Sequence, residues 1–469
     1  MGIFSFIWLM LLVVGSLAAY LPSKHDQIDE EENHFSLYPG KKWVVLVSGS
    51  DSWRRGYRHQ ADVCHAYQIV KANGIPEENI ILMMVDDMAY NPKNPTPGVM
   101  INRPNGTNVY EGVVVDYKGA DVNSTNFLNI ITGNKSAMKS IGSGKVVEGG
   151  RHDTIFINFV DHGTTGLVAF PNDFLYADQL NDAFNTMYAN KSYRKMLLYI
   201  EACESGSMFD GILNDETKIF AVTAAGPREN SWGCYCEEES GPYKTCLGDS
   251  FSVSWMEDLD ATLSDPSEKK KTVFNKFQTI RTKVTDSNVM AYGDFCAGHE
   301  KLSTYIGFPK TRSTLSAEPT TTEKISMSSR DVEEKHIKYQ LAHNQLTKQE
   351  KEEIRKELRQ NNEKRLIIDR VFNDIYSMIV NIRPEIKNEI GELQQPKNLK
   401  LTLDMFPCYR SIMNKITESC FSLPQNPYTL DRMKIFANLC VVDNQAHYLV
   451  ESFVDKSCSN IPTNILNVF

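Results

Sequence analysis

The segment that decides the fold is Thr-Ile-Phe-Ile-Asn-Phe-Val at positions 154–160, which leads directly into Asp161-His162-Gly163. Its side chains are almost all apolar, without the polar alternation of a strand that has one face in water. A short, continuous apolar run of this kind predicts a strand that is buried on both faces of a parallel sheet.

Four more runs of this kind lie on either side of it, at residues 43–47, 80–85, 196–200 and 219–223. Between the first two, apolar and small residues recur at helical spacing, and Gly74 and Pro76 then provide a stop. This strand–helix–strand repetition predicts an α/β/α sandwich with a mostly parallel central sheet and right-handed crossovers. Ligands bind such sheets at the carboxyl ends of the strands.

The composition is that of a globular protein. The chain has 469 residues, of which 41% are hydrophobic and 23% charged, which excludes a wholly disordered, collagen-like or membrane-embedded protein. The net charge of −9 argues against a protein that binds nucleic acid through a broad basic surface. Residues 1–309 carry −11 and residues 310–469 carry +2. We expect the two parts to attract each other, and protonation of carboxylates to weaken that attraction.

The N-terminal sequence predicts entry into the secretory route. Residues 3–19 are almost continuously apolar, and Ser16-Leu17-Ala18 fits the small-x-small rule for signal cleavage. We expect a signal peptide over residues 1–18 and an N-terminal propeptide over 19–40, with an uncleaved anchor as the alternative. No other run of about 18 apolar residues follows, so we expect no membrane span after signal removal. Four Asn-x-Ser/Thr sequons predict glycosylation: Asn105, Asn123, Asn134 and Asn190.

Ten cysteines are present, and in an oxidising compartment structural cysteines tend to pair. Two disulfides with three possible connectivities can form among the last four cysteines, Cys408, Cys420, Cys440 and Cys458. Cys236 and Cys246 flank a short loop and can form a third disulfide. A zinc site that adds Cys234 to this pair is the competing interpretation. It lacks a nearby His and the usual Cys-x-x-Cys spacing, so we predict no metal site.

The character of the sequence changes after the sheet domain, which we expect over residues 41–309. Ser, Thr and Pro dominate residues 313–322, so 310–346 are expected to form a flexible linker and activation segment. Thr347 and Glu350 form a capping-box pair that predicts a charged helix through residues 351–365. We expect residues 347–469 to form a separate, small helical domain that is tied together by the four late cysteines.

Two of the apolar runs end in reactive residues, His162 after one and Cys203 after the other. If the two strands are neighbours in one parallel sheet, the imidazole and the thiol meet at the same edge. Cysteine is a strong nucleophile once a base favours the thiolate, and the N–H groups of Gly163 and Cys203 could stabilise an oxyanion. The alternative is a buried core cysteine and a surface histidine. Because both residues follow strands and precede small residues, we favour Cys–His catalysis.

Several sequence blocks resemble the legumain family of asparaginyl endopeptidases and vacuolar processing enzymes. Two resemble its catalytic signatures, Asp161-His162-Gly163-Thr164-Thr165-Gly166 and Glu201-Ala202-Cys203-Glu204-Ser205-Gly206. Others lie at residues 57–62, 226–229 and 247–249, and the region with the four late cysteines resembles the family's helical prodomain. The resemblance covers nearly the whole chain. It implies a caspase-like α/β/α fold followed by an all-α, disulfide-linked prodomain.

The resemblance assigns His162 as the base and Cys203 as the nucleophile of a thiolate acyl-enzyme mechanism. It places five residues around the substrate: Arg58, Glu201, Asp249, Ser231 and His59. A side-chain amide offers one carbonyl acceptor and two N–H donors, so Arg58 can donate to the carbonyl while the two carboxylates accept from the nitrogen. An Asp side chain would meet those carboxylates as a like charge, so we expect it to be accepted only when protonated, at acid pH.

One position departs from the family pattern. Legumains usually carry an Asn two residues before the Arg-His pair, where it helps to orient the catalytic His, and this chain has Gly56 there in a loop one residue longer. Glycine has no side chain that could accept a hydrogen bond from the imidazole. A Cys–His dyad can still work, because cysteine needs less activation than serine, and we expect a lower rate.

The resemblance also implies control by the chain's own prodomain, and protein or peptide substrates with Asn before the cleaved bond. We expect the prodomain to cover the cleft, acid to release it, and self-cleavage to occur at Asn344, with Asn361 or Asn362 next. Cystatin-type inhibitors are a further implied class of partner, and no cofactor is expected. The expected location is the lysosome or vacuole, or outside the cell.

The sequence leaves three functions open. We favour an Asn-specific endopeptidase over a peptide ligase or transpeptidase on the same site, and over a non-catalytic or weakly active pseudo-enzyme. A lipid-anchor transamidase is disfavoured because that relative is membrane-bound and lacks this prodomain. A caspase is disfavoured by the signal peptide and by Glu-Ala-Cys at 201–203, where caspases prefer Gln-Ala-Cys.

Overall fold

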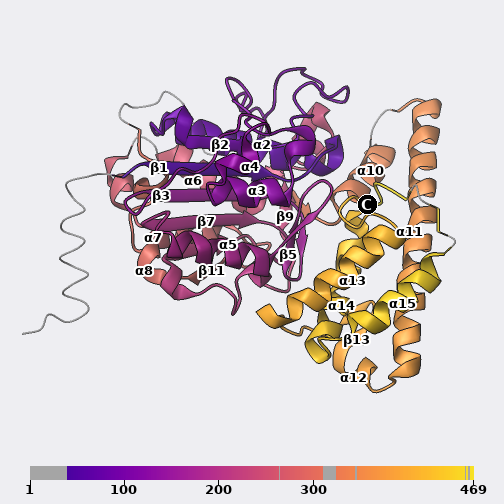
Figure 1. The fold of residues 1–469 in the computed structure, drawn as a ribbon. Helices are drawn as coiled ribbons and strands as arrows, with labels where there is room; N and C mark the ends of the chain where they lie inside the picture. The colour runs from indigo at the N-terminus through magenta and orange to yellow at the C-terminus, as the bar shows by residue number, and fades with distance from the viewer. Residues whose placement is uncertain (1–39, 263–264, 310–323, 344–345, 460, 463–464) are drawn as a thin grey trace, which may run out of the picture. The chain divides into compact units, whose positions relative to one another are not determined.

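The computed structural model describes residues 40–262, 265–309, 324–343, 346–459, 461–462 and 465–469 (Figure 1). The expected signal peptide and nearly all of the expected N-terminal propeptide lie outside these residues. The described residues belong to one unit, Gly40–Phe469, in which a sheet domain is followed along the chain by a helical domain.

Six strands form the central sheet in the order β11-β8-β7-β3-β1-β2. Their bounds are β1 Lys42–Ser48, β2 Ile80–Met83, β3 Thr154–Val160, β7 Lys195–Glu201, β8 Ile219–Thr223 and β11 Met290–Gly293. The first five are parallel to their neighbours, which confirms the five strands predicted from apolar runs. The sequence did not predict β11, an edge strand that pairs antiparallel with β8. Its four residues are only partly buried, so it lacks the apolar signal of the others.

Helices cover both faces of this sheet (Figure 1). They are α2 Trp53–Ala72, α3 Ser124–Ile131, α4 Lys135–Met138, α5 Ala177–Ala189, α6 Ser250–Thr262, α7 Val273–Lys283, α8 Phe295–Gly298 and α9 Ser303–Ile306. Alternate strand residues enter two separate cores: Val45 and Ile157 pack with α3 and α5, whereas Val44 and Phe156 pack with α2, α6 and α7. The predicted α/β/α sandwich is therefore confirmed.

Two small three-stranded sheets lie next to the carboxyl ends of the central strands. One contains β4 Gly163–Thr164, β5 Leu167–Ala169 and β6 Phe174–Tyr176, and begins directly after β3. The other contains β9 Trp232–Cys234, β10 Gly248–Asp249 and β12 Ser326–Ser328, with β9 in the middle. The Cys236–Cys246 disulfide closes the loop between β9 and β10.

The segment expected to be a flexible linker has regular structure in its described part. Strand β12 pairs antiparallel with β9, and α10 (Val332–His343) follows it. The prediction was wrong for residues 326–343 because β pairing with a distant strand leaves no periodic signal in a short Ser-rich sequence. Residues 310–323 lie outside the described part.

The C-terminal region is helical, as predicted. Its elements are α11 Lys348–Ile382, α12 Ile386–Ile390, α13 Phe406–Ser419, α14 Leu430–Val442 and α15 His447–Cys458, with a short β13–β14 pair at Gly391–Glu392 and Gln395–Pro396. The capping box of Thr347 and Glu350 opens α11, as predicted, and this helix runs through the charged stretch 351–365 to Ile382. Disulfides Cys408–Cys440 and Cys420–Cys458 join α13 to α14 and to α15.

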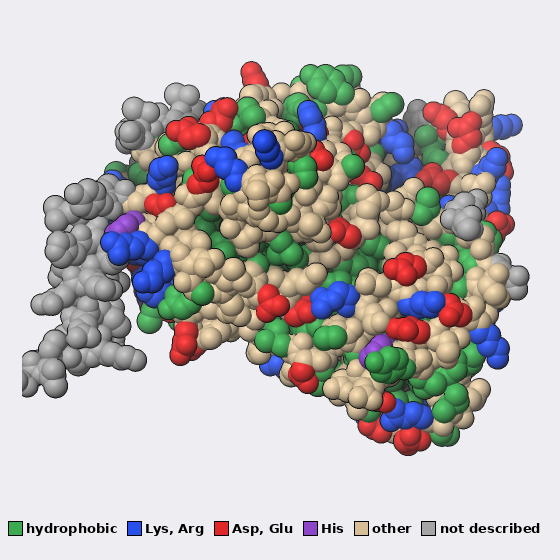
Figure 2. Space-filling view, viewed as in Figure 1, with side chains coloured by type: hydrophobic (Ala, Val, Ile, Leu, Met, Phe, Trp, Pro, Cys, Tyr) green, Lys and Arg blue, Asp and Glu red, His purple; other side chains and the backbone are tan. Residues whose placement is uncertain are grey.

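None of the helices in the described residues combines the length and the apolar composition that a membrane crossing requires. Figure 2 shows acidic and basic side chains interspersed on the visible face of the molecule.

Candidate active site

The site is built where β3 and β7 end side by side. The two strands pair in parallel through Val160 and Glu201, and the Asp161 N–H donates to the Glu201 carbonyl at 3.0 Å. His162 and Cys203 each lie two residues beyond this pair, so they leave the sheet at the same level on adjacent strands.

Gly163 lets the two chains approach each other closely. A Cβ atom at this position would lie 2.8 Å from the Cys203 carbonyl oxygen and 3.1 Å from the Cβ of Ala202. No real side chain fits at the first distance without a backbone shift. The glycine is therefore required by the contact between the His162 loop and the Cys203 loop.

The structure holds both reactive groups buried and neutral. Burial lowers the pKa of His162 well below its ordinary value, and the nearby Arg58, Arg55 and Arg330 lower it further. Burial raises the pKa of Cys203, against a lowering by Arg330. Its Sγ lies 3.6 Å from the Ser231 Oγ, and the His162 Nε2 has no hydrogen-bond partner among the described residues. Both side chains are therefore shielded from water in this structure.

A cluster of buried, ionisable side chains lies next to the thiol and is the candidate substrate pocket. Arg58 donates from Nε to the Asp249 Oδ1 at 2.8 Å, and both side chains are almost completely buried. Glu201 accepts from the backbone N–H and the hydroxyl of Ser252 at 2.9 and 3.0 Å. Burial and the neighbouring Asp249 raise the pKa of Glu201 well above its ordinary value.

Three atoms of this pocket are buried without a hydrogen-bond partner in the described part of the chain: Nη2 of Arg58, Oε1 of Glu201 and Oδ2 of Asp249. One is a donor and two are acceptors. A primary carboxamide offers the complementary set, one carbonyl oxygen and two N–H groups. An unpaired buried polar atom is costly, so the pocket is suited to a guest with this pattern.

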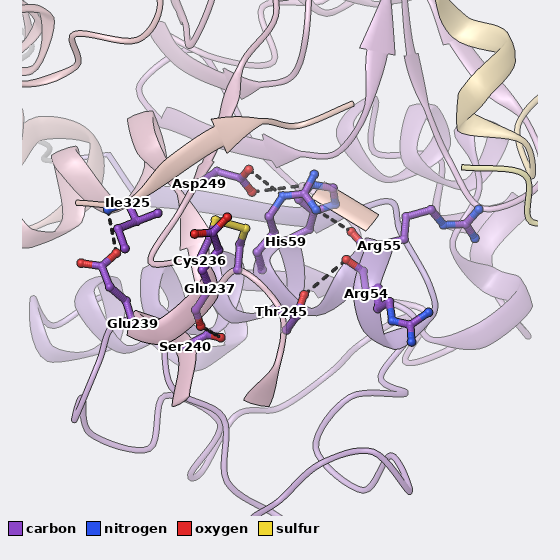
Figure 3. The surroundings of a disulfide bond; sticks show 12 residues. Arg54, Arg55, His59, Cys236, Glu237, Glu239, Ser240, Thr245, Asp249 and Ile325 are labelled. Carbon is purple, nitrogen blue, oxygen red and sulfur yellow. Dashed lines mark hydrogen bonds and ion pairs between the residues drawn. A yellow bond between two sulfur atoms is a disulfide. The ribbon is translucent and has the colours of Figure 1, made fainter. Parts of the chain in front are cut away.

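His59 was expected to contact the substrate, and the structure gives it a supporting position. Its Nδ1 lies 2.9 Å from the Ser50 Oγ, and the Ser50 hydroxyl donates to Asp161 in a short hydrogen bond. Its Nε2 lies 3.5 Å from Asp249, and its ring meets that of His162 edge to face with the centroids 5.0 Å apart. Figure 3 shows His59 beside Asp249, near the disulfide of Cys236.

Side-chain atoms of His59, Asp161 and His162 lie within 4.8 Å of one another, and these residues form the group within the described residues that could hold a metal ion. The same Asp161 oxygen already accepts from Ser50 and, at 2.6 Å, from the His162 N–H. These bonds occupy one of the two carboxylate oxygens, and the expectation of a metal-free mechanism stays a prediction.

Gly56 lies in the first turn of α2. A Cβ atom there would lie 2.8 Å from the Asp51 carbonyl oxygen and 2.9 Å from that of Ser50. The family's Asn therefore does not fit on this backbone. The preceding residue, Arg55, is buried, forms a short ion pair with Asp51 and donates to the Gln425 carbonyl of the helical domain at 3.3 Å.

Segment 326–330 lies across the site. After β12, the Ser329 N–H donates to the Ser231 carbonyl at 3.0 Å, and the two Ser hydroxyls are 3.2 Å apart. Arg330 donates to the Gly163 carbonyl at 2.9 Å and pairs with Asp431 of α14 at 2.6 Å. Arg330 could not be predicted from the sequence, because a charged residue in a Ser-rich stretch is most often solvated.

Further contacts connect the helical domain to the sheet domain. Arg410 makes a two-pronged ion pair with Asp178, with both distances near 3 Å, and Lys400 pairs with Asp210 at 2.8 Å. These pairs have the polarity that the charge distribution predicted. Arg54 and Glu357, at 2.5 Å, have the opposite polarity, so local complementarity contributes as well as net charge.

The other predicted sites are the four glycosylation sequons and the three candidate asparagines for self-cleavage. The sequon residues Asn105, Asn134 and Asn190 are exposed, and Asn123 is partly buried as the cap of α3. Asn361 is buried and both sides of its amide bond the Phe469 backbone. Asn362 is exposed in the middle of α11, and Asn344 lies outside the described residues.

Comparison with known proteins gives two family matches on this chain. The peptidase C13 family matches residues 42–308, and the legumain prodomain matches residues 356–458. Legumain from Homo sapiens is 40% identical over 86% of this chain and 89% of its own length. A vacuolar-processing enzyme from Vicia sativa is 35% identical over 95% of this chain and 91% of its own length.

Among solved structures, caspase-1 from Spodoptera frugiperda aligns with 59% of this chain and 93% of its own, with a TM-score of 0.33 and 11% identity. The assignment rests on the sequence matches. The two relatives each cover most of the chain, and the peptidase C13 match includes the strand ends that hold His162 and Cys203. The chain therefore belongs to the peptidase C13 family of cysteine peptidases and carries a legumain-type prodomain at its C-terminal end.

Proposed function

We propose that this cysteine peptidase cleaves after Asn, and after protonated Asp at acid pH, and that it is made as an inhibited precursor. The observation that carries the specificity is the set of three buried atoms without a hydrogen-bond partner, on Arg58, Glu201 and Asp249; the Asp249 oxygen lies 3.5 Å from the His59 Nε2. An Asn side chain would satisfy all three. An ionised Asp would place a negative charge against two carboxyl groups, so its cleavage requires acid.

The chemistry follows from the positions of the strand ends. His162 takes the proton of Cys203, and the thiolate sulfur attacks the carbonyl carbon of the scissile bond. The N–H groups of Gly163 and Cys203 stabilise the oxyanion. His162 then gives its proton to the leaving amine, which departs, and a water molecule deprotonated by His162 hydrolyses the thioester to release the acid.

Segment 326–330 supports the proposal of an inhibited precursor. It pairs with β9 in the manner of an added strand, which is how extended peptides bind sheet edges, and it brings Ser329 next to Ser231 and Arg330 onto Gly163. The side chain of Ser329 is too short to occupy the carboxamide pocket as an Asn side chain would. The segment thereby excludes substrate while offering no Asn to cleave.

A titratable side chain in α10, His336, supports the proposal that acid releases the inhibitory segment. His336 is 1% exposed, its Nε2 lies 2.7 Å from Gln340, and its Nδ1 has no partner among the described residues. Burial lowers its pKa to about 4, with a further lowering by Arg54 and Lys244. A released segment would return this pKa to about 6.5. Below pH 6.5 the released form therefore binds more protons, and docking weakens by up to roughly 3 kcal/mol as the pH falls to about 4.

We expect His336→Gln to lower the pH at which the precursor opens by about half a unit to one unit. Glutamine has no proton to gain, so the penalty on docking disappears. The measurement is the rate of Cys203 alkylation in a non-cleavable precursor against pH. His299→Gln is the matched control, because His299 is exposed. Identical opening curves for wild type and His336→Gln would exclude His336 as the sensor.

Self-cleavage is best placed at Asn344. Proteases bind extended chain, and Asn361 and Asn362 both lie inside the long helix α11. Asn344 follows α10 and precedes the cap of α11 at Thr347. A cut there separates the segment that fills the cleft from the helical domain. The name of the plant relative and the exposed sequons support a vacuolar or lysosomal location; binding of cystatin-type inhibitors stays a prediction.

The test is acid incubation of the purified precursor followed by mass spectrometry of a peptide library that contains Asn, Asp and Gln. We expect cuts after Asn at all active pH values, cuts after Asp that fade above about pH 5 as its carboxyl ionises, and none after Gln, which is one methylene longer. Product masses separate hydrolysis from ligation. Cuts spread evenly over other residues would refute the proposed specificity.

A further inference from the structure

Asp62 is a completely buried carboxyl group that neither the catalytic pair nor the pocket proposed above uses, and burial together with the neighbouring Asp249 raises its pKa well above the ordinary value. It lies on α2 one turn after Arg58, and residues four apart share one face of a helix. Its side chain is 0% exposed. Its Oδ2 accepts from the backbone N–H of Asp249 at 3.2 Å, and its Oδ1 accepts from Asn102 at 2.7 Å.

Asn102 has only one orientation in this network. Its Nδ2 donates to the Leu247 carbonyl at 3.0 Å as well as to Asp62, and a carbonyl can only accept. Its Oδ1 therefore faces His65, whose Nδ1 lies 2.8 Å away and must carry a proton. The His65 Nε2 lies 3.0 Å from Asp260, which as a carboxylate also requires a donor. His65 is thus an imidazolium with both protons in use.

The pKa of His65 agrees with this assignment. Burial lowers it, but the hydrogen bond and charge of Asp260 and the bond to Asn102 outweigh burial, so the net shift is upward. The groups that face Asp62 itself are Arg58 on the same helix, Asp249 on β10, Glu201 on β7 and the thiols of Cys64 and Cys234.

We propose that Asp62 is a positioning residue that determines which side chain the peptidase accepts before the cleaved bond. Its carboxyl group accepts a hydrogen bond from the backbone N–H of Asp249, which lies on β10, a strand of only two residues. This bond holds the Asp249 carboxylate so that it faces the substrate amide. Asn102 and His65 hold Asp62 in turn. The inference rests on the carboxamide pocket proposed above, and it assigns the geometry of that pocket to a residue outside it.

The effect on specificity has a definite direction. An Asn side chain has two N–H groups and needs both acceptors, Glu201 and Asp249, whereas a protonated Asp has one O–H and needs only one. Displacement of Asp249 therefore lowers the rate of cleavage more for Asn substrates than for Asp substrates. His162 and Cys203 lie on other loops, after β3 and β7, so we expect a displaced β10 to affect the pocket more than the catalytic pair.

The experiment measures kcat/KM for matched Asn and Asp peptides at acid pH in enzyme that has been activated by acid from the full-length precursor, for wild type, Asp62→Ala and Asp62→Asn. We expect Asp62→Ala to lower the Asn rate about 10- to 100-fold and the Asn-to-Asp ratio about tenfold, because buried donors lose their acceptor. Asp62→Asn keeps one acceptor oxygen, so its rate and its Asn-to-Asp ratio should lie between those of wild type and Asp62→Ala. The rate of Cys203 alkylation by iodoacetamide should stay within twofold of wild type.

The matched control is Asp116→Ala. Asp116 is also buried and accepts the N–H of a strand residue, Leu82, at 3.1 Å, but it lies on the β2 side, away from the pocket. The Asp116→Ala substitution should lower the melting temperature and leave the Asn-to-Asp ratio of kcat/KM unchanged. If Asp62→Ala yields no folded protein, Asp62→Asn carries the test with an expected ratio about threefold lower.

An unchanged ratio in both Asp62 variants, or an equal fall in Asp116→Ala, would overturn the inference and leave the proposed function intact. A wild-type enzyme whose Cys203 is alkylated but which cuts no Asn peptide would refute the proposed function itself.

Discussion

Replacement of Cys203 by Ala is expected to lower peptidase activity by at least about 10⁴-fold after acid treatment, and to abolish self-cleavage of the precursor. The reason is chemical: the acyl-enzyme cannot form without the sulfur, and the remaining oxyanion donors give only a small residual rate. The fold should be unaffected, because the side chain loses a single contact, 3.6 Å from Ser231. The measurements are hydrolysis of an Asn peptide and the size of the chain on denaturing gels.

The matched control is Cys64→Ala. Cys64 is also a free, buried cysteine, but it lies on α2 with its thiol 3.8 Å from the Met84 sulfur, and burial raises its pKa beyond the ordinary range. This variant should retain activity within about threefold. Persisting cleavage in Cys203→Ala, or loss in both variants, would assign the nucleophile elsewhere.

Replacement of Arg58 by Ala should lower kcat/KM for Asn peptides about 10²- to 10³-fold and also destabilise the protein. Two effects combine. The pocket loses the donor for the side-chain carbonyl, and the buried Asp249, Asp62 and Glu201 lose the cation that compensates them. Breaking a buried pair by removing one partner costs about 3–5 kcal/mol. The measurements are kcat/KM and the free energy of unfolding.

Arg58→Lys separates the two effects. It keeps the positive charge but lacks the planar fork of donors, so stability should largely recover while Asn cleavage stays at least about tenfold below wild type. Arg54→Ala is the control for loss of a neighbouring arginine, since Arg54 pairs with Glu357 of the helical domain and does not line the pocket. Full activity of Arg58→Ala would contradict the assigned pocket.

Sequence alone predicted the parts of the site that the sheet determines. The apolar runs specify strands, and parallel pairing then places the residues after them at one edge, which is why His162 and Cys203 could be brought together before any coordinates. The edge strand β11 and the pairing of β12 with β9 could not be predicted in this way. Both are short and only partly apolar, and their partners lie far away in the sequence.

The buried charges mark the other limit of prediction. Asp62 and Arg330 are each fixed by partners distant in the chain, Asp249 and Asp431, and nothing in their local sequence distinguishes them from solvated surface residues. Gly56 is an intermediate case. The sequence showed that the family's Asn is absent, and the structure adds that the backbone of Ser50 and Asp51 leaves no room for it.

Arg330 has a consequence for how the precursor opens. One guanidinium bonds the Gly163 carbonyl of the catalytic loop and Asp431 of α14, and it is almost out of contact with water. Withdrawal of α14 alone would leave this buried cation with Glu204, 3.6 Å away, in place of Asp431. Withdrawal of segment 326–330 alone would break the same ion pair with Asp431. The pair is lost whichever part leaves first, so the first departure makes the second easier, and opening should be partly cooperative.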